Sequence, residues 1–86
     1  MQKTVTKELI EGKIKEVTYT VLPSGKSIVC EITLENGFTV RGDAAVVDKA
    51  YFDEAVGQKI AYGRAFDKIW QIEGYLLQQR LSEQGK

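Results

Sequence analysis

Apolar and polar residues alternate along the first half of the chain, which is the two-residue period of a half-buried β-strand. Turn sequences interrupt the alternation twice, first at Pro23-Ser24-Gly25 and then at Glu35-Asn36-Gly37. The alternating segments around these turns are residues 14–22, 27–34 and 38–41. Because both turns are short, the pattern predicts a three-stranded antiparallel meander, which the chain leaves at Gly42.

The same alternation predicts how the strands pair. In the second hairpin, a two-residue loop would set apolar Ile32 opposite Arg41 and so mix polar and apolar residues on one face. A three-residue loop, with Gly37 in the left-handed conformation, sets Ile32 opposite Val40 and Glu31 opposite Arg41. We therefore predict the three-residue loop, and the same test predicts an even-length loop in the first hairpin.

Two short helices are predicted, one on either side of the meander. Thr6 can cap the first helix, and Gly12 ends it. Asp48 is a suitable N-cap for the second helix, over residues 49–55, and Gly57 is expected to break it.

A long helix is predicted next, from about residue 58 to residue 81, followed by a polar tail at 82–86 that we expect to fray. Its apolar residues lie on two sides rather than one. The stripe suited to covering the sheet consists of Ile60, Ala61, Ala65, Ile69, Ile72 and Leu76. A second stripe, rotated around the axis, consists of Gly63, Phe66, Trp70, Gly74, Leu77 and Leu81.

The two glycines of the second stripe favour an interface with another chain. A glycine inside a helix costs about 0.5–1 kcal/mol relative to alanine. Gly63 and Gly74 are eleven positions apart, so they share one side of the helix, and close approach of a partner backbone would offset that cost. In the alternative, the second stripe packs on the two short helices. We favour self-association into a homodimer or a higher assembly, since so small a chain has little else to cover this helix.

The predicted fold class is α+β, in a single domain over residues 1–86. A three-stranded antiparallel meander follows a short N-terminal helix. A short helix and the long C-terminal helix come after it, and the long helix packs on the sheet and on a partner subunit.

Composition excludes several classes of function. The 12 basic and 12 acidic residues balance, which argues against sequence-independent nucleic-acid binding. The chain has no histidine, so a histidine-based catalytic or metal site is not expected. The one cysteine, Cys30, cannot form a disulfide within the chain and is expected to be buried and inert. No signal peptide or membrane span is expected, and the cytoplasm is the natural compartment.

Few side chains suggest chemistry. The acidic residues Asp43, Asp48, Asp53 and Glu54 could form an acid–base pair, but helix caps and solvated surface explain them better. Arg64 lies beside the apolar stripes and, together with Arg41, could hold a phosphate; alternatively, it is an exposed helical arginine or makes an interface salt bridge. The aromatic residues of the helical half could stack a base but suit a core or an interface better: Tyr51, Phe52, Tyr62, Phe66 and Trp70.

Three motifs together resemble those of the small phage and prophage proteins grouped under phages N4 and Sf6, most of which have no assigned function. The motifs are Asn36-Gly37-Phe38-Thr39-Val40-x-Gly42, Phe52-Asp53-x-x-x-Gly57-x-x-x-Ala61-x-x-x-Ala65 and Ile69-Trp70-x-x-Glu73-Gly74-Tyr75-Leu76-Leu77. Their order and spacing cover nearly the whole chain.

Part of that group is similar to the first type of Thoeris anti-defence sponge proteins. These phage proteins bind cyclic ADP-ribose-type signals made by bacterial TIR enzymes, without cleaving them, and they assemble through helix-mediated dimers. The resemblance implies a non-enzymatic binding protein of the host cytoplasm, without cofactor or metal. Phe38 would stack the base and Arg64 would grip the diphosphate, while Arg41 and Asp43 are expected beside them. In the alternative, the long helix binds a host or phage protein.

Overall fold

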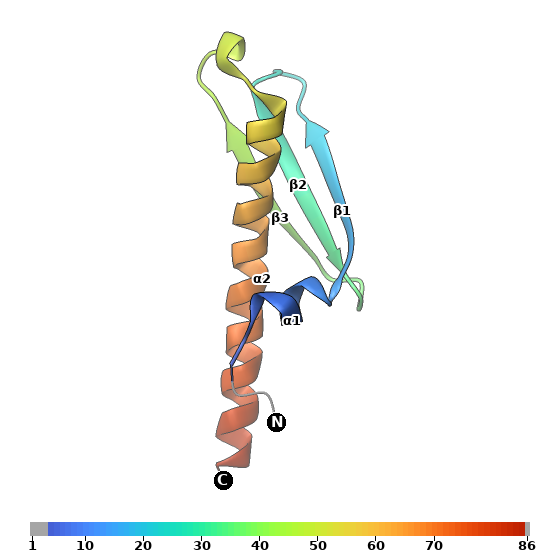
Figure 1. The fold of residues 1–86 in the computed structure, drawn as a ribbon, viewed down its shortest axis with the longest axis vertical. Helices are drawn as coiled ribbons and strands as arrows, with labels where there is room; N and C mark the ends of the chain where they lie inside the picture. The colour runs from blue at the N-terminus through green and yellow to red at the C-terminus, as the bar shows by residue number, and fades with distance from the viewer. Residues whose placement is uncertain (1–3, 86) are drawn as a thin grey trace.

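The structure, a computed structural model, describes residues 4–85 as a three-stranded sheet with one long helix along one of its faces (Figure 1). The elements in chain order are α1 (Lys7–Glu11), β1 (Ile14–Val21), β2 (Ser27–Leu34), β3 (Thr39–Ala45), the 3-10 helix η1 (Lys49–Tyr51) and α2 (Glu54–Gln84). The strands lie in the order β1-β2-β3, and both pairs are antiparallel. The α+β class and the meander predicted from the sequence are confirmed.

Both predicted hairpin registers are confirmed. Glu31 pairs with Arg41 across β2 and β3, and their side chains form an ion pair at 3.0 Å. Gly37 takes a φ of 90°, which an L side chain rarely adopts, and so permits the three-residue loop. In the first hairpin the amide of Leu22 donates to the carbonyl of Ser27, so four residues form the loop.

β3 is longer than the sequence predicted, and the prediction that the chain leaves the sheet at Gly42 was wrong. The strand continues to Ala45, and Gly42 and Ala44 are both buried against α2. These small residues interrupted the apolar pattern because α2 lies too close to the strand for larger side chains. A Cβ on Gly42 would overlap the backbone of Ala61 and Ala65.

The boundaries of the helices also differ from the prediction. Asp48 does cap a short helix, but that helix ends at Tyr51 instead of residue 55. Asp53 then caps α2, accepting hydrogen bonds from the amides of Ala55 and Val56, so α2 begins at Glu54. Gly57 therefore lies inside α2, where the sequence predicted a break. It is buried, and a Cβ there would lie 3.0 Å from Cγ2 of Ile28 on β2.

The core lies between β2, β3 and one row of residues on α2. Every second residue of β2 is buried, as predicted: Ile28, Cys30, Ile32 and Leu34. The buried row of α2 repeats every four residues: Gly57, Ala61, Ala65, Ile69 and Glu73. Ile60 and Leu76, predicted to face the sheet, are 43% and 38% exposed. The row drifts around the helix because a straight helix crosses a twisted sheet at an angle.

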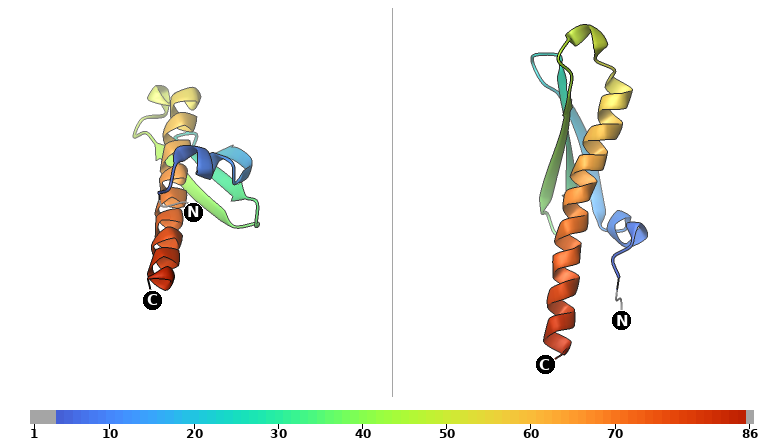
Figure 2. Two further views of the ribbon diagram at one scale, coloured as in Figure 1. Left: turned by 60° about the horizontal axis from the view of Figure 1, so that its bottom comes forward. Right: turned by 90° about the vertical axis from the view of Figure 1, so that its left-hand side faces the viewer.

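The molecule is elongated. Its radius of gyration is 15.8 Å, whereas a compact domain of this length has about 12 Å. The cause is the length of α2, which spans about 46 Å with 31 residues, against about 26 Å for an eight-residue strand. Figure 2 shows the sheet and α2 as two layers, with the last turns of α2 extending beyond the sheet and past α1.

Candidate functional site

A groove of about 400 Å³ lies at the lower end of the sheet in Figure 1, where α1, the β2–β3 hairpin and α2 meet. This volume falls within the usual range for small-molecule sites. We refer to it as the Phe38 groove. The residues that line it are Lys13, Leu34, Glu35, Asn36, Phe38, Ile72, Glu73, Leu76 and Arg80.

A partly buried ion pair contributes to one side of the Phe38 groove. Nζ of Lys13 lies 2.6 Å from Oε1 of Glu73, whose side chain is only 6% exposed. Glu73 is the last residue of the buried row of α2, and Lys13 follows α1. The backbone carbonyl of Lys13 accepts a hydrogen bond from the amide of Glu35 in the β2–β3 hairpin. The pair thus joins α1, the hairpin and α2, which fixes the shape of this end of the molecule.

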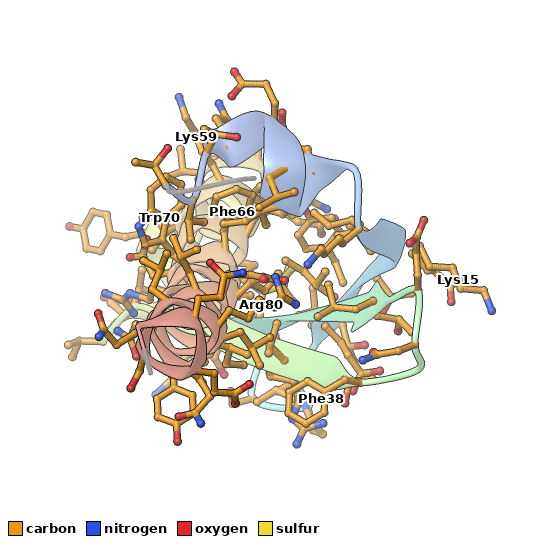
Figure 3. The ribbon with its side chains drawn as sticks, turned by 90° about the horizontal axis from the view of Figure 1, so that it is seen from below. Lys15, Phe38, Lys59, Phe66, Trp70 and Arg80 are labelled. Atoms are coloured by element: carbon orange, nitrogen blue, oxygen red, sulfur yellow. The ribbon has the colours of Figure 1, made fainter. Side chains whose placement is uncertain are left out.

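Two side chains in the Phe38 groove are available for a ligand. Phe38 is 53% exposed, and its amide donates to the side chain of Asn36, which fixes the hairpin at that point. Arg80 extends from α2 into the space between α1 and the sheet (Figure 3). Within residues 4–85, Arg80 has no hydrogen-bond or ion-pair partner. An exposed ring and a free guanidinium are the groups that stack a base and bind a phosphate.

The residues predicted as a ligand site do not meet in one subunit. Nη1 of Arg64 donates to the backbone carbonyl of Asp43 at 2.8 Å, across the edge of β3. Arg41 lies on the face of the sheet away from α2 and pairs with Glu31. Phe38 is five residues from Asp43, about 16 Å along an extended chain. The structure therefore brings Arg64 to Asp43 but not to Phe38.

The predicted interface stripe lies largely on the side of α2 that the sheet does not cover. The rings of Phe66 and Trp70 are 6.3 Å apart. Phe66 is half-buried against the core, and Trp70 is 43% exposed, away from the sheet (Figure 3). Apart from the adjoining turns of α2 itself, no atom of residues 4–85 would lie within 4 Å of a Cβ on Gly63 or Gly74. Leu77 and Leu81 are half-buried.

The acidic cluster and the cysteine have structural roles. Asp48 and Asp53 accept hydrogen bonds from helix N-terminal amides, as their capping role requires. Burial raises the pKa of the Cys30 thiol, and hydrogen bonding with Tyr19 offsets part of that rise. Burial likewise raises the pKa of Tyr62. Among residues 4–85 no group of three or more acidic or cysteine side chains is placed to hold a metal ion.

Sequence reasoning missed the polar residues of the Phe38 groove. One signal could have found Glu73, because it continues the four-residue spacing of Gly57, Ala61, Ala65 and Ile69 and so occupies a buried position. A buried carboxylate needs a partner, but nothing in the sequence identified Lys13, which is sixty positions away. Arg80 was passed over because it belongs to neither apolar stripe.

Comparison with known proteins gives one match. The model of a family described as phage protein (N4 Gp49/phage Sf6 gene 66) matches residues 5–81, which is most of the chain. No curated protein and no solved structure matches it. In the part of the chain that the structure describes, no helix has the length and apolar character needed to cross a bilayer.

Proposed function

The chain belongs to the phage protein (N4 Gp49/phage Sf6 gene 66) family, as its sequence motifs predicted, and from that premise we propose that it is a non-catalytic ligand-binding protein. The ligand is a small phosphorylated nucleotide of the cyclic ADP-ribose type, held in the Phe38 groove. In an infected cell, binding such a signal removes it from solution without changing it.

The observation that carries this proposal is that one groove is lined by both Phe38 and Arg80, and that Arg80 has no hydrogen-bond or ion-pair partner among residues 4–85. Stacking a base on an aromatic ring contributes about 1–3 kcal/mol. A guanidinium binds a phosphate through two parallel hydrogen bonds, and no other group of residues 4–85 occupies the donors of Arg80. The apolar surface of Leu34, Ile72 and Leu76 between them suits the ribose and ring edges of a nucleotide.

The proposal assigns the phosphate contact to Arg80 rather than to Arg64. Arg64 already donates to the carbonyl of Asp43 and lies outside the Phe38 groove. Within the groove, Glu73 is held by Lys13, and the chain has no histidine to act as a general base. Both observations support binding without turnover.

Isothermal titration with the cyclic ADP-ribose isomers tests the proposal, with ADP-ribose and adenosine monophosphate as controls. We expect one cyclic isomer to bind at micromolar concentration or below and to be recovered intact. Phe38→Ala and Arg80→Gln should each weaken binding about tenfold or more, while Arg64→Gln should leave it within about threefold. Absence of heat from every isomer with folded protein would overturn the proposal. If Arg64→Gln weakened nucleotide binding more than Arg80→Gln, the ligand would bind at the edge of β3 beside Arg64 and not in the Phe38 groove.

A second candidate function, docking of a host or phage protein on the long helix, is favoured by the exposed aromatic side chains of α2. Trp70 is 43% exposed and Tyr75 is 69% exposed. Affinity capture from infected cells tests this alternative. A stoichiometric partner that Trp70→Ala abolishes, together with no nucleotide binding, would favour protein docking over ligand binding.

A further inference from the structure

β3 is an edge strand whose outward backbone groups are largely unpaired. The amide of Leu34 donates to the carbonyl of Phe38, and the register is regular from there to Ala45, so the even-numbered residues of β3 bond to β2. The odd-numbered residues turn their amides and carbonyls away from the sheet. Among residues 4–85, no group accepts from the outward amides of Arg41, Asp43 and Ala45.

The other edge of the sheet, β1, is protected against further pairing. Its register shifts at Lys15, between Ile14 and Glu16, and a bulge with an exposed lysine is a common means of blocking an edge. β3 pairs with β2 without any such shift. An edge of this kind can accept a further strand.

α2 lies over β3 instead of over the middle of the sheet. A Cβ on Gly42 would overlap the backbone of Ala61 and Ala65, and β1 lies largely clear of the helix (Figure 1). A helix is about 10 Å wide with its side chains, whereas strands are about 4.8 Å apart. A helix above an edge strand therefore extends about one strand width beyond the sheet, and α2 forms one wall of the space beneath it.

The side of α2 that faces this edge is basic and apolar. The row one position before each buried residue of α2 consists of Val56, Ile60, Arg64, Lys68 and Ile72. Nη1 of Arg64 donates to the carbonyl of Asp43, which places the row beside the edge of β3. Two of the five residues are basic and none is acidic. Asp67 lies about 180° around the helix from the buried row, so it does not offset this charge.

A second cavity, of about 300 Å³, lies at the upper end of this edge in Figure 1, where the chain passes from β3 to η1. Its apolar lining includes Ala44 and Val46, Tyr51 of η1, and Val56 and Ile60 of α2. Val56 and Ile60 are both exposed. We call this cavity the Ile60 pocket, and its lining favours an apolar side chain as its occupant.

We propose that β3 and α2 bind an extended peptide segment of a partner protein, which adds to the sheet as a fourth strand antiparallel to β3. Seven peptide residues match the length of Thr39–Ala45. Opposite residues of a ladder share a face, so the peptide side chains opposite even-numbered residues of β3 face α2. The helix therefore reads every second side chain of the peptide.

The spacing along α2 determines which peptide fits. Ile60, Arg64 and Lys68 follow one another at about 6 Å along the helix, and alternate residues of a strand are about 6.8 Å apart. An apolar side chain enters the Ile60 pocket, and carboxylates two and four positions later meet Arg64 and Lys68. Because α2 runs opposite to β3 (Figure 1), the peptide runs along α2, and its order from the N-terminus is apolar, x, acidic, x, acidic.

A second copy of the chain fits this edge less well than an acidic peptide. Two β3 strands paired about a two-fold axis would bring the same row of both helices together. Arg64 and Lys68 would then face basic residues of the partner, whereas an acidic strand meets them with opposite charge. Charge complementarity therefore selects an acidic segment of another protein.

A synthetic peptide tests the proposal in fluorescence anisotropy. The probe is a blocked, fluorescein-labelled peptide of seven residues, with leucine at position 2, glutamate at positions 4 and 6, and threonine elsewhere. We expect saturable binding, weakened about tenfold or more when lysine replaces both glutamates or when the order of residues is reversed. No saturable binding up to about 1 mM with folded protein, or equal binding of the lysine peptide, would overturn the proposal.

N-methylation of the same peptide tests whether it adds as a strand. The amides of peptide positions 3 and 5 point at β3, opposite Asp43 and Arg41, whereas the amide of position 4 points away. A methyl group at position 3 or 5 should weaken binding about tenfold or more, and one at position 4 should leave it within about threefold. Equal effects at all three positions would overturn strand addition.

Substitutions in the protein test the same contacts. Arg64→Glu should weaken the glutamate peptide and strengthen the lysine peptide, a reversal that a damaged fold would not give. Asp43→Pro removes an outward amide that makes no bond to β2 and should abolish binding, while Asp43→Ala keeps this amide and should stay within about threefold. If Asp43→Pro instead lowered the mass of the unliganded protein in sedimentation and wild type bound no peptide, the edge would belong to a second copy and the proposal would be overturned.

The peptide site is separate from the nucleotide site. The Ile60 pocket and the Phe38 groove share no lining residue. Phe38→Ala should leave peptide binding within about threefold, and failure of either ligand to bind would leave the other proposal standing.

Discussion

Gly42 of β3 and Ala65 of α2 lie where the backbone of the sheet directly contacts the backbone of the long helix. A Cβ on Gly42 would overlap the backbone nitrogen of Ala65 and lie 2.9 Å from the carbonyl carbon of Arg64. Backbone meets backbone here, so neither side chains nor solvent can adjust to relieve an added atom. This contact fixes the distance between the two layers, and the alanines of α2 are small for the same reason.

Gly42→Ala should therefore destabilise the protein strongly. Overpacking a tight core site costs about 1–3 kcal/mol, and a backbone-to-backbone contact is at the upper end of that range. Urea unfolding measures the change. Ala45→Ser, an exposed change in the same strand, is the control and should stay within about 0.5 kcal/mol. Equal stability of Gly42→Ala and wild type would contradict the close approach.

The ion pair between Lys13 and buried Glu73 predicts a coupled effect of two substitutions. Lys13→Met leaves Glu73 charged and unpaired in a buried position, which costs about 3–5 kcal/mol for a fully buried pair. Because the Lys13 side chain is 34% exposed, water can partly replace the lost partner, and we expect a smaller loss of about 2 kcal/mol. The double variant Lys13→Met/Glu73→Leu should recover most of this loss in urea unfolding. Additive losses in the double variant would show that the two side chains do not act as a pair.

Stability should fall at alkaline pH. Burial raises the pKa of Cys30 above its usual 9.0 and those of Tyr19 and Tyr62 above 10.0. Below pH 9.0 both folded and unfolded states keep these protons, so the contribution to stability is fully present. Between the unfolded and folded pKa values only the unfolded state ionises, so stability falls as pH rises.

Urea midpoints at about pH 8 and about pH 10 measure this loss. Cys30→Val, which keeps a buried apolar side chain of similar size, removes the first titrating group. The decline between the two pH values should be smaller in Cys30→Val than in wild type. An identical decline in both proteins would show that the thiol contributes nothing to it.

Gly74→Ala should have opposite effects at low and high protein concentration. In the separate subunit the added methyl group meets no atom of residues 4–85 outside its own helix turn, and alanine gains up to about 1 kcal/mol of helix propensity over glycine. In the self-association predicted from the sequence, the same methyl group would lie in the interface with the partner subunit. Thermal melts should show stabilisation of the dilute variant and a lower melting temperature than wild type at high concentration. Stabilisation at every concentration would contradict a partner at this site.

The alternation of apolar and polar residues was sufficient to predict the strands and hairpins, whose structure depends on contacts between residues close in the sequence. Alternation placed all of β2 and both hairpin registers, because a slip of one residue would turn Ile32 and its neighbours to the wrong face. It failed at Gly42 and Gly57, which interrupted the pattern as breakers do. Both residues are glycine because another element lies against them in the fold, and such contacts leave no trace in short-range periodicity.

The candidate site was less accessible to sequence reasoning than the fold. The exposed aromatic Phe38 was identified through the family resemblance, but its neighbours in the groove come from segments far apart in the chain. Arg64 appeared suited to a phosphate, yet the structure commits one of its donors to the carbonyl of Asp43. Only the packing of α2 on the sheet brings Arg80 to the groove that Phe38 also lines.

The central prediction from the sequence is that a second copy of the chain covers the side of α2 that carries Trp70 and Gly74, and sedimentation equilibrium tests it most directly. Over a range from about 1 to about 300 µM, we predict a mass approaching twice the 9.6 kDa of one chain, and a return toward one chain in Trp70→Gly. A wild-type mass that stays at one chain up to the highest concentration would contradict the account.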